Sequence, residues 1–277
     1  MAYNFLRFPN FRDKALTLSY DDGSESDVRF LEILNAYNVK CTFNLNSGLF
    51  SEDGKGRITE EQARTLYTPY GHEIAAHGFK HLPLSDVDVT VGVNDVLSDV
   101  KKLEGIFGTR IIGMAYANGR FDDRAVETLK TCGIKYCRTT KTTEDFSIPA
   151  DWLRLPATCH HGNPRLMELA GKFLENPEIK YYWSRKPKIF YLWGHSYEFD
   201  RNNNWEVIEN FCKFVSGRED VWYATNGEIY RYVEAYDRLE FSVNGEFVFN
   251  PTATDVFIEY FGRRYVLPAG KTTKISE

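Results

Sequence analysis

Residues 14–23 read KALTLSYDDG, a short apolar run that ends at two aspartates and a glycine. After it, helix-like and strand-like segments alternate as far as residue 224, in about seven units. Strands that alternate with helices pair in parallel through right-handed crossovers. A chain of 277 residues is long enough for such a sheet to close on itself. The pattern therefore predicts an α/β fold, a distorted (β/α)7–8 barrel of the TIM-like type.

The end of the chain has a different character. Past about Tyr236 come four short strand-like runs, 239–243, 246–249, 256–260 and 264–267, with turn signals at 244–245 and 262–263. We predict a barrel domain over residues 1–235 and a small antiparallel β extension over 236–277 that packs on it. Three roles are open to this extension: an oligomerisation surface, a sugar-binding annex, or a lid over the rim of the barrel.

The composition narrows the classes of partner. The net charge is −5 and the pI is near 5.8, so we expect no basic surface for nucleic acid or an anionic membrane. No apolar run approaches the roughly 18 residues that span a bilayer. The five cysteines form no C-x-x-C pair and the first residues show no signal-peptide pattern, which favours free thiols and a cytoplasmic protein. The oligomeric state stays open.

Polar side chains follow three of the expected strands, at the point where each strand ends. Asp21 and Asp22 follow the first, His77 and His81 follow the third, and His195 follows a later one. The carboxyl ends of parallel strands meet on one face of a barrel, where active sites form. Two imidazoles and one carboxylate, here Asp22, make a metal triad with open coordination positions, and Asp21 beside it is free to act as a base. His77 and His81 are four apart, so we expect them on one face of a helical turn.

The segments LTLSYDDG, GHEIAAHGFKH and YLWGH, in this order, resemble the polysaccharide deacetylase family (carbohydrate esterase family 4, the NodB-homology domain). The resemblance runs from about residue 15 to about residue 225. It implies a hydrolase of C–N bonds other than peptide bonds, whose substrate is a carbohydrate bearing N-acetylated amino sugars. It also implies Zn²⁺, or another divalent metal such as Co²⁺ or Ni²⁺, as the cofactor. By the same resemblance Asp22, His77 and His81 match the metal ligands, Asp21 the general base and His195 the general acid.

One motif departs from the family pattern. The family's third motif is R-x-P-x-G, where the arginine supports the base, whereas residues 115–119 here read AYANG. Without that arginine the pKa of Asp21 would rise unless another cation replaces it, and Arg120, Arg138 and Arg154 are the candidates. The resemblance also places the amide that holds the oxyanion near Asn118, so we include the substrate-site residues Tyr116, Asn118 and Gly119.

Three more residues complete the expected substrate site. Asp151 and Trp152 resemble the end of the family's fourth motif, in which the Asp steadies the catalytic His and the Trp walls the acetyl pocket. Tyr197, just past the strand that precedes His195, is a candidate for stacking on a sugar ring. The pair His160-His161 either reaches the mouth of the site or is a loop pair without a role.

Several alternative functions stay open. The same residues suit cleavage of an O-acetyl ester, and the altered third motif leaves room for a hydrolase of another C–N bond on the same barrel. A carbohydrate-binding relative without catalysis has no need of Asp21 beside Asp22. A structural metalloprotein would offer no open coordination position.

Overall fold

The computed structural model describes residues 1–277 except 1–2, 4, 179–180, 182–184 and 276–277. At its centre nine strands form one sheet, and all their pairings are parallel. The spatial order is β7-β6-β5-β4-β3-β2-β9-β8, with β10 beside the first part of β2. The strands are β2 (Lys14–Asp21), β3 (Cys41–Leu45), β4 (Glu73–Ala76), β5 (Gly113–Ala115), β6 (Tyr136–Thr142), β7 (Leu155–Ala157), β8 (Cys159–His160), β9 (Lys188–Gly194) and β10 (Val221–Tyr223).

The sheet closes into a barrel where β7 and β8 follow one another along the chain. Thr158, the residue between them, donates its backbone N–H to the carbonyl of Tyr191 in β9 at 2.9 Å. Its hydroxyl accepts from the backbone N–H of the same tyrosine at 3.0 Å. β7 and β8 have only three and two residues, so this side of the barrel is its least regular part. The predicted distorted (β/α) barrel is confirmed.

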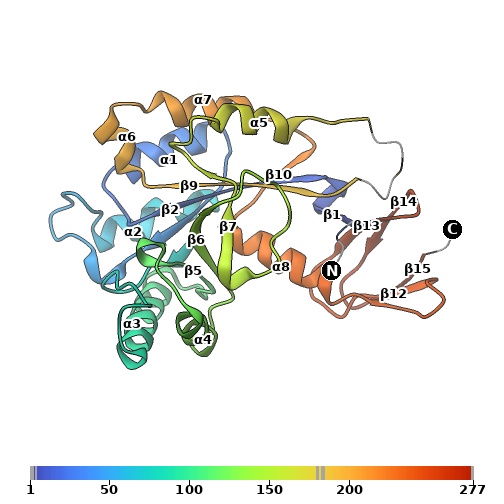
Figure 1. The fold of residues 1–277 in the computed structure, drawn as a ribbon, viewed down its shortest axis with the longest axis horizontal. Coiled ribbons are helices and arrows are strands. Elements are labelled where there is room, and N and C mark those ends of the chain that lie inside the picture. The colour runs from blue at the N-terminus through green and yellow to red at the C-terminus, as the bar shows by residue number, and fades with distance from the viewer. Residues whose placement is uncertain (1–2, 4, 179–180, 182–184, 276–277) are drawn as a thin grey trace.

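Helices cover the barrel on both sides (Figure 1). α1, α5 and α7 lie together on one side, and α3 and α4 lie together on the other. The helices are α1 (Asp27–Ala36), α2 (Glu60–Leu66), α3 (Val89–Phe107), α4 (Asp123–Thr131), α5 (Leu166–Leu174), α6 (Tyr197–Asn202), α7 (Glu206–Val215) and α8 (Asn226–Asp237). Of these, α6 and α8 lie where the sequence pattern predicts no helix. No helix within the described ranges is both long and apolar enough to cross a membrane.

The alternation of side chains along β2 explains why the interior of the barrel is polar. Leu16, Leu18 and Tyr20 are fully buried in the apolar layer that also contains α1 and α7. The residues between them face the lumen, because successive side chains of a strand point to opposite faces. The three lumen pairs along β2 are Thr17 with Asn226, Ser19 with Asn44, and Asp21 with Arg138.

The C-terminal extension forms two small antiparallel sheets. Its strands are β11 (Glu240–Phe241), β12 (Phe247–Phe249), β13 (Val256–Tyr260), β14 (Arg263–Leu267) and β15 (Thr272–Lys274). One sheet has the order β11-β12-β15, and in the other an N-terminal strand, β1 (Leu6–Arg7), pairs with β13, which pairs with β14. Arg7 is completely buried and forms ion pairs with Asp13 and Glu259. The two ends of the chain are therefore joined in one sheet.

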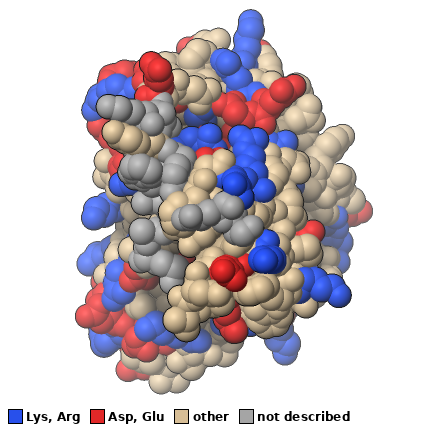
Figure 2. Space-filling view, turned by 90° about the vertical axis from the view of Figure 1, so that its right-hand side faces the viewer, with Lys and Arg blue, Asp and Glu red and all other residues tan. Residues whose placement is uncertain are grey.

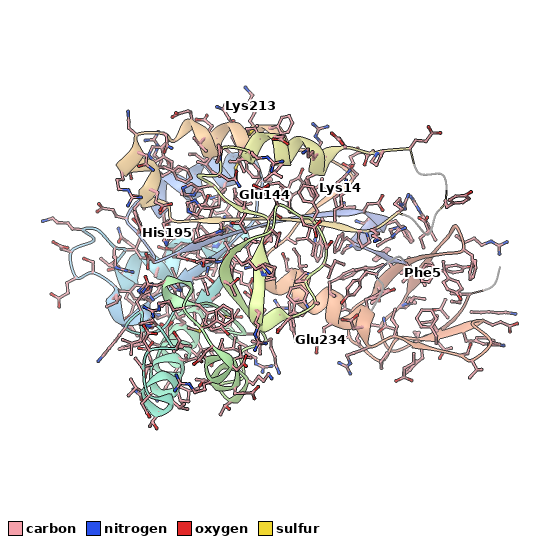
Figure 3. The ribbon with its side chains drawn as sticks, in the orientation of Figure 1. Phe5, Lys14, Glu144, His195, Lys213 and Glu234 are labelled. Carbon is pink, nitrogen blue, oxygen red and sulfur yellow. The ribbon has the colours of Figure 1, made fainter. Side chains whose placement is uncertain are left out.

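The extension lies at the end of the barrel opposite His195 (Figures 1 and 3). His195 follows β9, at the carboxyl end of the strands, whereas Phe5, Lys14 and the extension lie toward the amino end. Figure 2 shows the extension's end of the molecule, where Lys and Arg side chains are interspersed with Asp and Glu. This placement rules out a lid over the strand ends that carry His195.

Candidate functional site

The loop after β2 holds Asp22 in an unusual backbone conformation. Its φ is 82°, in the left-handed region that non-glycine residues rarely adopt, and such strain is typical of functional sites. Two partners fix the residue there. Its N–H donates to the carbonyl of Asn44 at 3.0 Å, and the guanidinium of Arg57 donates to its backbone carbonyl. Arg57 also lies 3.3 Å from Oδ1 of Asp22, a contact that no sequence pattern predicted.

His77 and His81 lie in a tight loop after β4, not on a helical turn, so the predicted reason for their proximity is wrong. The loop turns at Gly78, and His81 is left-handed with φ 57°. Two buried acids of α3 hold the loop from below. Asp99 accepts from the backbone N–H of His77 at 3.0 Å, and Asp95 accepts from that of Lys80 at 2.8 Å. The spacing of four residues brings the rings together through this loop, with centroids 4.7 Å apart.

Asp22, His77 and His81 form a cluster with the chemistry of a metal site. Nδ1 of His77 is 2.9 Å from the carbonyl oxygen of Ala115, which can only accept, so Nδ1 carries the proton and Nε2 presents a lone pair. Nε2 of His81 is 3.2 Å from that nitrogen, and Oδ1 of Asp22 is 4.0 and 3.9 Å from the two nitrogens. One ion with ligand distances of about 2.0–2.2 Å can bridge atoms at such spacings after a small adjustment. These three residues therefore fit a divalent metal.

Arg138 of β6 takes the place of the missing motif arginine. Its guanidinium donates to Oδ2 of Asp21, and the two side chains are 1% and 3% exposed. Asn44 donates to the other carboxylate oxygen at 2.8 Å. Burial raises the pKa of Asp21, but the charge and hydrogen bond of Arg138 and the two nearby imidazoles outweigh it and leave the pKa below its ordinary value.

The other two arginine candidates lie elsewhere. Arg120 pairs with Asp86 at 3.0 Å, and Arg154 pairs with Asp123 and Asp151. Ala115 and Arg138 are register partners on β5 and β6. The arginine therefore lies on β6 instead of at the motif position on β5, and from there it contacts the carboxylate of Asp21.

His195 lies just after β9 (Figure 3), and its ring faces the two aspartates. Its Nε2 is 3.8 Å from Oδ2 of Asp21 and 4.0 Å from Oδ2 of Asp22, and the side chain is 21% exposed. On the other side of the ring, Nδ1 is 3.5 Å from Oε1 of Glu198. Burial lowers the pKa of His195, but Glu198 and the two aspartates raise it by more, so the net pKa is raised. Glu198 was missed by sequence reasoning, although its position three residues after His195 at the start of α6 is a usable signal.

The altered third motif forms a short 3-10 turn over Ala117–Gly119. Asn118 is exposed and left-handed, with φ 54°, and its N–H donates no hydrogen bond within the described part of the chain. Gly119 cannot be replaced easily, because a Cβ there would lie 2.3 Å from Oγ1 of Thr140. Tyr116, in contrast, is buried, with its hydroxyl donating to the carbonyl of Leu153 at 3.0 Å. Its ring is a packing element.

Asp151 and Trp152 do not have the contacts that the resemblance implies for them. Asp151 caps the 3-10 helix Trp152–Arg154 and pairs with Arg154 at 2.6 Å, while the carboxylate that faces His195 is Glu198. Trp152 packs edge-on against Tyr230 of α8 and lines a pocket of about 130 Å³ together with Thr17 and Asn226. Tyr197 does lie beside His195, with ring centroids 5.1 Å apart, as expected of a residue at the mouth of the site.

The chain is similar to known proteins in both sequence and fold. The polysaccharide deacetylase family model matches residues 9–137, which contain Asp21, Asp22, His77 and His81. No curated protein sequence matches the chain.

Among solved structures, the chain resembles a protein from Mycobacterium smegmatis assigned to the polysaccharide deacetylases, with 18% identity, a TM-score of 0.59, and 84% and 94% of the two chains covered. It also resembles PuuE allantoinase, with 15% identity, a TM-score of 0.62 and coverage of 81% and 91%. A third is a family 4 acetyl xylan esterase from Clostridium thermocellum in complex with a cobalt ion, with 15% identity, a TM-score of 0.52 and coverage of 78% and 90%. These likenesses establish the fold, and the polysaccharide deacetylase family model matches the first half of that fold, residues 9–137.

Proposed function

We propose that this chain is a metal-dependent deacetylase that removes acetyl groups from N-acetylated amino sugars of a poly- or oligosaccharide. The observation that carries the proposal is the convergence of Asp21, Asp22, His77, His81 and His195 on one end of the barrel. The family match supports a deacetylase hydrolase, and this arrangement supports the division of roles within it.

Asp22, His77 and His81 would hold the metal, for which Zn²⁺, Co²⁺ or Ni²⁺ suits imidazole and carboxylate ligands. When bound, such an ion polarises the acetyl carbonyl and lowers the pKa of a coordinated water from about 15.7 toward 7. Three protein ligands leave positions for both water and substrate.

Asp21 is suited to the role of general base. Hydrogen bonds from Arg138 and Asn44 fix its carboxylate, and its lowered pKa keeps it ionised at neutral pH. It takes a proton from the water that attacks the acetyl carbon. The family resemblance implies that the N–H of Asn118 would donate to the tetrahedral oxyanion, a kind of contact worth about 3–4 kcal/mol in another hydrolase.

His195 is suited to the role of general acid. Its raised pKa favours a protonated ring, and Nε2 points toward the same space as Asp21. That proton passes to the departing nitrogen as the C–N bond breaks. An amine is a poor leaving group without a proton, so this step matters more for an N-acetyl group than for an ester of a less basic alcohol.

The proposal is tested by incubating the purified, metal-loaded protein with N-acetylglucosamine oligomers and measuring acetate and free amine. We expect both to appear in equal amounts. A protein that releases neither, with metal bound, would contradict the proposal.

A second candidate is hydrolysis of another C–N bond, such as ring opening of a small cyclic amide. The observation that favours it is the replaced third motif, since residues 115–119 shape the region where the acetyl group would sit. The similar fold of PuuE allantoinase shows that this barrel is not restricted to proteins named as deacetylases. A panel of N-acetylated sugars, O-acetylated xylan and cyclic amides, compared by kcat/KM, separates the candidates.

A further inference from the structure

A second cluster of two histidines and one acid lies next to the proposed metal site. Nε2 of His160 and Nε2 of His161 are each 3.0 Å from Oε2 of Glu198. The spacing of these three groups would also admit a metal ion. The contacts of the other ring nitrogen, Nδ1, in each histidine indicate whether Nε2 carries a proton or offers a lone pair to a metal ion.

The backbone fixes the tautomer of His160. The N–H of Gly162 donates to Nδ1 of His160 at 3.0 Å, so that nitrogen presents its lone pair. A neutral His160 must then carry its proton on Nε2, directed at Glu198. A metal on Nε2 would force the proton onto Nδ1, where it would oppose the N–H of Gly162.

His161 has the same arrangement. Its side chain is 3% exposed, and burial lowers its pKa, which favours the neutral ring. Its Nδ1 lies 3.1 Å from the hydroxyl of Tyr20, which can donate to it, whereas the carboxylate on the side of Nε2 can only accept. His161 therefore also directs an Nε2–H at Glu198. The ring fits closely against the backbone, since a Cβ on Gly194 would lie 2.0 Å from its Nδ1.

Oε2 of Glu198 thus lies 3.0 Å from two ring nitrogens, within ion-pair distance of both, although no aligned hydrogen bond reaches this oxygen from the described residues. The other oxygen of Glu198, Oε1, faces Nδ1 of His195 at 3.5 Å. Nδ1 is buried and has no closer hydrogen-bond partner among the described residues. The Glu198 side chain is 14% exposed, so its charge is only weakly screened by water.

We infer that Glu198 is the positioning carboxylate of His195, fixed by His160 and His161, and that this cluster is not a second metal site. The inference rests on the proposed role of His195 as general acid. When the C–N bond breaks, the Nε2 proton of His195 passes to the nitrogen, and its Nδ1 proton stays directed at Glu198. The proton that Asp21 took from water returns to Nε2 across 3.8 Å, so the cycle closes without another reactant.

The test compares Glu198→Gln with Glu209→Gln, a change of an exposed acid on the neighbouring helix α7. Each protein is assayed on an N-acetylglucosamine oligomer and on 4-nitrophenyl acetate, whose leaving group needs no proton. For Glu198→Gln we expect kcat on the amide to fall by about 100-fold, within the range of a general acid, and by less than about threefold on the ester. KM and bound metal stay unchanged, and Glu198→Asp recovers part of kcat.

Two results would overturn the inference. One is an unchanged kcat of Glu198→Gln on the amide, and the other is an equal loss on both substrates, which indicates a general structural defect. A readout that is independent of activity is the ¹⁵N spectrum of the His195 imidazole. We expect protonated Nδ1 in the wild type and in Glu209→Gln, and its loss in Glu198→Gln. If the wild type fails to cleave the amide, the proposed function fails, and this spectrum alone decides whether Glu198 and His195 are paired.

Discussion

Two clusters in this barrel have the same composition, two histidines and one acid, but opposite hydrogen-bonding. In the first, the carbonyl of Ala115 accepts from Nδ1 of His77, and this leaves the lone pair of Nε2 facing Asp22. In the second, the amide of Gly162 donates to Nδ1 of His160, and this puts a proton on the Nε2 that faces Glu198. The group on the far side of the ring therefore determines whether a His/acid cluster suits a metal or a carboxylate.

The largest effect should come from removing a ligand of the first cluster. We expect His77→Ala to lose bound metal and to lower kcat/KM by about 10³-fold or more, because a catalytic metal contributes several kcal/mol to the transition state. Metal content of the purified variant and acetate release measure the two effects. Retention of stoichiometric metal by His77→Ala would show that the ion binds elsewhere.

A second substitution separates metal binding from proton transfer. Asp21→Asn keeps the shape of the side chain and the ligands Asp22, His77 and His81, so metal binding should persist while kcat falls by about 10²–10⁴-fold. Arg138→Met should have a smaller effect in the same direction, because it removes only the cation that holds the carboxylate. The measurement is metal content beside kcat on the amide. Full turnover in Asp21→Asn would show that Asp21 is not the general base.

A third substitution addresses the second cluster. His161→Gln removes one of the two imidazoles that lie 3.0 Å from Glu198, so we expect metal content to stay the same as in wild type and kcat on the amide to fall by about tenfold. Elemental analysis of the wild type should give one ion per chain. Two ions in the wild type and one in His161→Gln would contradict the hydrogen-bonded interpretation and assign the cluster to a metal.

The sequence predicted the residues of the first cluster better than the reason for their proximity. Periodicity and strand ends were enough to place Asp21, Asp22, His77, His81 and His195 near one another, because parallel strands share a carboxyl edge. The spacing of the two metal-site histidines was attributed to a helix, whereas the chain forms a loop there. The long amphipathic helix α3 was predicted with the same ends that the structure shows.

Other features depend on contacts that no local pattern reveals. The choice of Arg138 among three arginines follows from the register of β5 and β6, and register is a tertiary property. The six-residue helix α6, which carries Glu198, is too short to show a helical period. α8 begins with Asn226-Gly227, which resembles a turn, although the capping box from Thr225 to Glu228 was a signal for a helix. Glu198 and α8 were missed for these reasons.

The smallest effect concerns a buried histidine that belongs to neither cluster. Nδ1 of His72 accepts from the backbone N–H of Cys41 at 3.1 Å, and its Nε2 lies 3.0 Å from Oδ1 of Asn35. Burial lowers the pKa of His72 from 6.5 to about 4. The unfolded chain therefore binds the proton first as the pH falls, and the stability that neutral His72 contributes is lost between pH 6.5 and about 4.

At about 1.4 kcal/mol per pH unit this loss amounts to at most about 3 kcal/mol. Urea unfolding of the wild type and of His72→Gln, measured from pH 7 to pH 4, tests it. Glutamine can accept and donate as the neutral ring does, but it does not titrate, so the variant should lose less stability than the wild type over this range. Titrations elsewhere in the protein, such as that of Asp27, whose pKa burial raises to about 7, are common to both proteins and cancel in the difference. His72, which lies in neither cluster, is a neutral ring with a hydrogen bond at each nitrogen. Identical pH dependence of the two proteins would contradict that description.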